Sequence, residues 1–209
     1  MTKKYVLDRK NCQFLGILLT SIGLASILAW HYEVPSPIAT PLRPKHDKKT
    51  ISYEVVFADD ALLTKDGTIK EVGETFANAK GWRQADITFS KTNQRPDLVI
   101  RFDTPAEIAA SSLICSAEYN CQIENQILVN ATLWQHGDGW NGSTVDYHSL
   151  IINHETGHFL GLGHWHCACW LMPAPVMLSH QNVTSFHIWK PNPWPTAEEI
   201  EAVRKNVID

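Results

Sequence analysis

Three histidines and one glutamate lie within eleven residues, in the segment HETGHFLGLGH at residues 154–164. His154 and His158 are four residues apart, so on a helix both imidazole rings leave the same face. Imidazole nitrogens bind Zn²⁺ at distances of about 2.0–2.1 Å. The spacing therefore predicts that His154 and His158 bind one zinc ion from a single helix.

His164 is the third predicted ligand. Gly161 permits the backbone turn with positive φ that ends a helix, and the chain then doubles back and brings His164 to the same ion. Three neutral ligands leave a fourth position open for water, which is the arrangement of a catalytic zinc site. Glu155 can reach this water without binding the metal, so it is the predicted general base.

Periodicity and capping signals predict the helices that position this segment. Ser143, with Asp146 three residues later, is the signature of a capping box and begins the helix that carries the histidines. Thr196 with Glu199 repeats the signature before a final helix. An earlier helix is expected over residues 68–81, where apolar side chains recur on one face.

Alternating or β-rich runs predict four strands, at residues 51–57, 86–90, 97–102 and 126–134. Strands and helices in this order predict an α+β domain over residues 51–209. We expect a mixed twisted sheet packed on the active-site helix, followed by a small C-terminal part with the final helix.

Residues 1–30 have the layout of a targeting segment. A basic stretch precedes residues 14–30, which are apolar and carry no charge. The run ends at Trp30 in a poor cleavage site, which favours an uncleaved, single-pass membrane anchor with the N-terminus in the cytoplasm and the domain outside. A cleaved signal peptide and a secreted domain are the alternative. Residues 31–50 carry four prolines and predict an extended tether.

The composition excludes several classes of protein. Apolar residues make up 44% and charged residues 19% of the 209 residues, which excludes a disordered chain, a collagen and a coiled coil. The formal net charge of −4 becomes −7 without the first thirty residues, which hold four basic residues and one acidic residue. An acidic body without a basic stripe argues against nucleic-acid binding.

Four cysteines follow the predicted tether, and an exported domain is where disulfides persist. Cys115 and Cys121 bracket a short polar loop, which predicts a disulfide between them; two free thiols are the alternative. Cys167 and Cys169 are separated by one residue, so a bridge between them would be strained. They either pair elsewhere or remain reduced.

Three further histidines are weaker candidates. His166 competes with His164 for the third ligand position, but the spacing from His158 favours His164. His180 is a candidate for stabilising an oxyanion, although a surface loop is the simpler interpretation. His148 lies on the predicted zinc helix, where contact with solvent or with the helix cap is expected.

The segment HETGHFLGLGH matches the long zinc motif of the metzincin metallopeptidases. Over residues 51–206 the chain also resembles, in its motifs NHETGH, PAPVM and PNPWP, a bacterial family of exported metzincin-like proteins. The resemblance implies a zincin fold in which Met177, within PAPVM, forms a methionine turn beneath the zinc. It also implies that the substrate peptide pairs with a sheet edge, for which residues 126–134 are the candidate.

The chain departs from these families at two positions. Trp189 stands where the bacterial family has a cysteine, so the usual partner of Cys167 is absent. Ser179 stands where some metzincins have a tyrosine that contacts the metal or an oxyanion, so no such role is carried over.

These residues predict a zinc-dependent metalloendopeptidase. Glu155 takes a proton from the water that attacks a carbonyl polarised by Zn²⁺, and returns it to the leaving amine. One alternative is a zinc-holding module that binds cell-envelope partners without proteolysis, against which the intact Glu155 argues. The other alternative is an amidase that acts on wall peptides, which the sequence does not separate from an endopeptidase.

Overall fold

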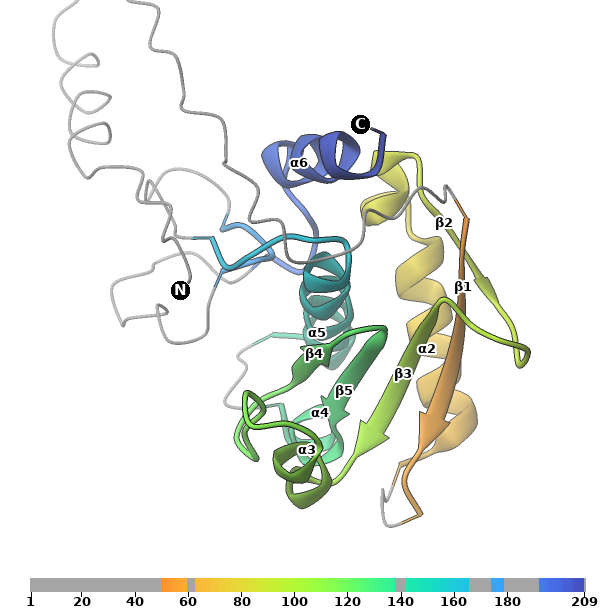
Figure 1. The fold of residues 1–209 in the computed structure, drawn as a ribbon, viewed down its shortest axis with the longest axis vertical. Helices are drawn as coiled ribbons and strands as arrows, with labels where there is room; N and C mark the ends of the chain where they lie inside the picture. The colour runs from red at the N-terminus through yellow and green to blue at the C-terminus, as the bar shows by residue number, and fades with distance from the viewer. Residues whose placement is uncertain (1–49, 60–62, 138–141, 166–173, 179–191, 209) are drawn as a thin grey trace, which may run out of the picture.

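A computed structural model describes residues 50–59, 63–137, 142–165, 174–178 and 192–208. Five strands form one sheet in the order β2-β1-β3-β5-β4 (Figure 1). Strands β2, β1, β3 and β5 are parallel, and β4 runs antiparallel to β5 at one edge. The bounds are Thr50–Phe57 for β1, Thr88–Lys91 for β2, Leu98–Asp103 for β3, Cys121–Ile123 for β4 and Gln126–Asn130 for β5.

Two long helices, α2 (Lys65–Ala77) and α5 (Thr144–Phe159), cover the same face of this sheet (Figure 1). Apolar side chains of β1, β3 and β5 pack against both helices in one buried cluster. Burial of this apolar surface stabilises the layered arrangement. The predicted α+β class, with a mixed sheet packed on the histidine-bearing helix, is confirmed.

The shorter helices lie beyond the two ends of the sheet (Figure 1). Helices α3 (Pro105–Ser111) and α4 (Ala131–His136) directly follow strands β3 and β5. The last helix, α6 (Ala197–Ile208), lies across the opposite end, beside the 3₁₀ helix η1 (Trp82–Ala85).

The predicted strand over residues 126–134 is wrong in its second half. Strand β5 ends at Asn130, whose side-chain oxygen accepts hydrogen bonds from the backbone N–H groups of Thr132 and Leu133. This is an N-cap, and it begins α4 where the β-rich composition predicted a continued strand. The Asn130 cap therefore favours a helix here over a continued strand, because its side chain bonds to backbone N–H groups in the first turn of α4.

The predicted sheet edge also needs correction. Strand β4 pairs with β5 on its outer side, with Gln122 opposite Ile127, so β4 and not β5 forms this edge of the sheet. The predicted disulfide between Cys115 and Cys121 is confirmed, with Cα atoms 5.6 Å apart. It joins the first residue of β4 to the loop that precedes the strand.

Both predicted helix starts agree with the structure. The Ser143 hydroxyl accepts a hydrogen bond from the N–H of Asp146 at 3.1 Å, and α5 begins at the next residue. Thr196 caps α6 in the same way, through a bond from the N–H of Glu199 at 3.3 Å. Each cap satisfies a backbone donor that has no partner within its helix.

The predicted membrane anchor is corrected by the structure. In the part of the chain that is described, no helix is both long and apolar enough to cross a bilayer. The longest, α5, has 16 residues, whereas a span needs about 20. Residues 14–30, which carried the prediction, lie outside the described residues. The predicted anchor, membrane partner and extracytoplasmic location are therefore not supported by the described residues.

Candidate metal centre

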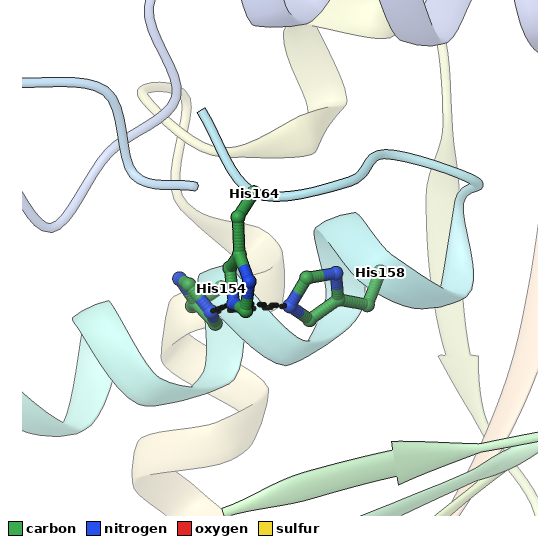
Figure 2. Close-up of side chains that lie close together, drawn as sticks. All are labelled: His154, His158 and His164. Atoms are coloured by element: carbon green, nitrogen blue, oxygen red, sulfur yellow. Dashed lines mark hydrogen bonds between the residues drawn. The ribbon is translucent and has the colours of Figure 1, made fainter. Parts of the chain in front are cut away.

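Three histidine side chains converge at the C-terminal end of α5 (Figure 2). His154 and His158 project from the last two turns of the helix, and His164 comes from the segment that follows it. The Nε2 atom of His158 lies 3.2 Å from the Nε2 atoms of both other rings. The remaining pair, in His154 and His164, is 3.3 Å apart. The three residues predicted as zinc ligands are therefore brought together.

Backbone carbonyls fix the protonation of two of these rings. Nδ1 of His154 lies 2.7 Å from the carbonyl oxygen of Val176, and Nδ1 of His158 lies 2.9 Å from that of Leu162. A carbonyl oxygen only accepts hydrogen bonds, so in each ring the Nδ1 atom donates. In a neutral imidazole the Nε2 atom then carries a lone pair. The close Nε2 atoms of His154 and His158 thus present lone pairs to each other, an arrangement that a shared cation stabilises.

The spacing fits a tetrahedral metal ion. Bonds of about 2.0–2.1 Å at tetrahedral angles place neighbouring ligand nitrogens about 3.3–3.4 Å apart. The three observed separations lie within about 0.2 Å of that range. Three neutral nitrogen donors suit zinc and other borderline transition metals, and hard cations such as Ca²⁺ prefer oxygen donors. The residues present therefore fit the predicted zinc ion.

Gly161 sets the turn that brings His164 back to the helix. It has a φ of +96°, a conformation that strains residues with a Cβ atom. The N–H of Gly161 bonds to the His158 carbonyl, and the N–H of Leu162 bonds to the Gly157 carbonyl. These two bonds form a Schellman motif. The same turn places the Leu162 carbonyl against the His158 ring. Gly161 therefore helps to orient His158 as well as to bring back His164.

Residues 174–178 are joined to the histidine site by backbone hydrogen bonds. The Val176 carbonyl accepts from the ring of His154, and the Met177 carbonyl accepts from the N–H of Trp165 at 2.8 Å. Trp165 directly follows His164 and forms a β-bridge with Leu178. One short buried segment is thus bonded to one ligand and to the neighbour of another.

Met177 is fully buried and lies against the histidine helix. A Cβ atom placed on Gly157 would lie only 2.2 Å from the Met177 sulfur and 3.0 Å from Cζ2 of Trp82. Glycine at this position therefore lets the thioether approach the helix backbone next to His158. The methionine-turn role of Met177 stays a prediction.

Two glutamates are buried in the segments that carry or contact the ligands. Glu155 follows His154 on α5 and is only 6% exposed. Glu199, in the first turn of α6, is completely buried, and its carboxylate accepts backbone N–H bonds from Val176, Met177 and Thr196. Burial raises the pKa of Glu199, against the opposing effect of these backbone bonds. Sequence reasoning identified Glu199 only as part of a helix cap.

The sequence predicted that His148 contacts solvent or the helix cap, and the structure instead buries it. It is 6% exposed, and its ring stacks on Trp134 with centroids 3.6 Å apart. Its Nε2 lies 2.8 Å from the Trp134 carbonyl, and its Nδ1 contacts the Glu71 carboxylate. The apolar pattern of α5 gave no sign of this buried polar contact with α2. His166, His180, Cys167, Cys169, Ser179 and Trp189 lie outside the described residues.

The fold has a distant likeness among solved structures. The crystal structure of archaemetzincin from Methanopyrus kandleri covers 80% of this chain and is itself covered completely, with 12% sequence identity and a TM-score of 0.47. No curated protein is detectably similar in sequence. Residues 33–195, well over half of the chain, match the model of a family described as "Protein of unknown function (DUF3152)", and the chain belongs to this family.

Proposed function

We propose that this protein is a zinc-dependent hydrolase, and specifically a metalloendopeptidase that cleaves peptide bonds. The observation that carries the proposal is the set of three Nε2 atoms at 3.2–3.3 Å from one another. Two of the rings donate from Nδ1 to backbone carbonyls, so in the neutral ring Nε2 is the unprotonated nitrogen that can bind a metal. Three nitrogen ligands and an open fourth position characterise catalytic zinc sites, whereas structural sites are closed by four ligands.

A zinc ion held here supplies Lewis-acid chemistry, by polarising a carbonyl oxygen and by making water more acidic. Glu155 acts as the general base. Its carboxylate takes a proton from the attacking water as the oxygen bonds to the carbonyl carbon. It returns that proton to the amide nitrogen as the carbon–nitrogen bond breaks, so water is consumed and an acid and an amine are released. Its burial beside His154 favours this exchange by keeping the carboxylate out of bulk water.

The substrate that we propose is an extended peptide. Strand β4 is the sheet edge nearest to α5, and among the described residues no strand pairs with its outer side. An extended peptide can add to such an edge through backbone hydrogen bonds. The disulfide at Cys121 ties the start of this edge to the preceding loop. The edge role predicted for residues 126–134 thus passes to β4.

Met177 has a supporting role in this proposal. Its side chain packs against Gly157, the residue before His158. Its carbonyl accepts a bond from the N–H of Trp165, the residue after His164. We propose that Met177 supports the backbone on which the ligands lie, without binding the metal. A change of similar volume, Met177→Leu, is then compatible with zinc binding and activity.

The test of this function compares wild type with Glu155→Gln. Both proteins are incubated with a broad peptide library, and their zinc content is measured alongside cleavage. The glutamine keeps size and hydrogen-bonding shape but cannot accept the proton. We expect nearly unchanged zinc content and a loss of cleavage rate of about 10²-fold or more.

Glu201→Gln is the matched control, because it removes the same charge from an exposed position on α6, away from the proposed peptide-binding edge. We expect it to cleave at the wild-type rate. Cleavage by Glu155→Gln at the wild-type rate contradicts the mechanism. If wild type holds zinc and cuts nothing in the library, the endopeptidase assignment fails and the non-proteolytic zinc module is favoured.

A further inference from the structure

The Glu199 carboxylate makes more hydrogen bonds than a helix cap requires. In a capping box, the glutamate accepts one bond from the N-cap N–H, and Glu199 makes that bond with Thr196 at 2.7 Å. It also accepts bonds from Met177 at 2.7 Å and Val176 at 3.1 Å, although these residues precede it by more than twenty positions. A completely buried carboxylate is costly unless it is well bonded.

The bond to Met177 has a direct consequence for a metal ligand. The Met177 N–H and the Val176 carbonyl belong to the same peptide group, and in a trans peptide these two groups point in opposite directions. One end of this peptide donates to Glu199, and the other accepts from the ring of His154 at 2.7 Å. A carboxylate, a peptide group and an imidazole are therefore connected in series.

Such a series affects the ring in two ways. A negative charge at the N–H polarises the peptide, so its carbonyl becomes a stronger acceptor. A stronger acceptor at Nδ1 fixes the tautomer with Nε2 unprotonated and makes Nε2 a better donor to a metal. The bond to the Val176 N–H, on the preceding peptide, keeps the same carbonyl in place.

We propose that Glu199 is a positioning residue for the metal centre, which orients and polarises His154 through the peptide between Val176 and Met177. The proposal rests on the metal site described above and adds a remote carboxylate to it. It predicts an effect on His154 alone, because the ring of His158 is held by the Leu162 carbonyl, which Glu199 does not contact.

The experiment uses the full chain, labelled with ¹⁵N in its histidines, as wild type and as Glu199→Gln. In the metal-free proteins, the ring nitrogen shifts report the tautomer of each histidine. We expect wild-type His154 and His158 to be protonated at Nδ1. In the variant, the His154 signals move towards a mixture of tautomers and the His158 signals stay in place. Zinc titration of the same samples is expected to show affinity lower by about 10–100-fold.

Thr196→Ala is the control for a merely structural role. It removes the hydroxyl that caps the same helix and leaves both bonds that Glu199 accepts from the N–H groups of residues 176 and 177. We expect its His154 signals and zinc affinity to remain close to those of wild type. If Thr196→Ala and Glu199→Gln have equal effects, or if Glu199→Gln leaves His154 unchanged, the proposal is overturned.

Two further outcomes are separated by this design. If wild type takes up no zinc, the proposed function fails, whereas the His154 signals still decide the role of Glu199. If Glu199→Gln does not fold, Glu199→Asp is measured instead, because it keeps the charge and shortens the side chain by one methylene. A smaller shift confined to His154 then supports the proposal, and unchanged His154 signals overturn it.

Discussion

At the scale of single residues, helix α5 has a glycine, Gly157, at an interior position where alanine would ordinarily give a more stable helix. Glycine inside a helix costs about 0.5–1 kcal/mol relative to alanine. Gly157 nevertheless lies in α5 between the two helical ligands. The approach of the Met177 sulfur explains it, because a Cβ atom at this position would be 2.2 Å from that sulfur.

We expect Gly157→Ala to destabilise the protein by about 1–3 kcal/mol, since the added methyl overpacks a closed core. Gly67→Ala, in the first turn of α2, is the matched control. A Cβ there meets only Thr64, at 3.6 Å, so the same substitution should stabilise by about 0.5–1 kcal/mol. Urea denaturation measures both changes. A gain in stability for Gly157→Ala would show that Met177 is not packed against this residue.

The sequence predicted the ligands because their chemistry depends on local spacing. His154, His158 and Gly161 act within two helical turns, so a linear pattern contains their relationship. The groups that hold the rings are different, because a backbone carbonyl such as that of Val176 has no signature in the sequence. Glu199 was visible as a capping residue, but its bonds to residues 176 and 177 depend on how α6 packs.

At the scale of elements, the junction between β3 and α3 places the buried carboxyl group of Asp103 near two other charged side chains. Asp103, the last residue of β3, is 1% exposed and accepts a bond from Arg101 at 3.2 Å. Burial raises the pKa of Asp103, the Arg101 charge opposes this rise, and Glu107 adds to it. Glu107 itself has a lowered pKa, because it accepts bonds from the backbone and the hydroxyl of Thr104 in the α3 capping box.

A raised pKa in the folded state gives stability a defined dependence on pH. The contribution of Asp103 is fully present below its unfolded pKa and is lost as pH rises through the folded pKa. Asp103→Asn, which resembles the protonated form, should therefore become more stable relative to wild type as pH rises from about 3 to 7. Glu118→Gln, at an exposed position, should show a smaller change. A relative stability of Asp103→Asn that is constant across this range would contradict the assigned cause.

The elements were predicted best where one signal dominates. Alternation predicted β1, and caps predicted the starts of α5 and α6. Strand β4 pairs with β5 across a two-residue turn. It has only three residues, which are too few to show an alternating pattern. Helix α4 begins inside a β-rich run, because the Asn130 cap outweighs strand propensity there.

At the scale of the whole molecule, the histidine helix is fastened by segments far apart in the chain. The Trp82 indole donates to the Asn153 carbonyl at 3.0 Å, and the Asn153 amide donates to the Pro193 carbonyl at 2.8 Å. Residues from η1, α5 and the segment before α6 thus meet one position before the first ligand. Such long-range contacts set the rigidity of the metal site, and a local pattern in the sequence does not contain them.

The zinc content of the purified full chain shows directly whether the three histidines bind a metal ion. We expect about one zinc ion per chain in wild type. His158→Ala removes one of three converging ligands, and should abolish stoichiometric zinc. His136→Ala, at an exposed position in α4, should retain it. Wild type without stoichiometric zinc, or His158→Ala with full zinc occupancy, would contradict zinc binding by these histidines.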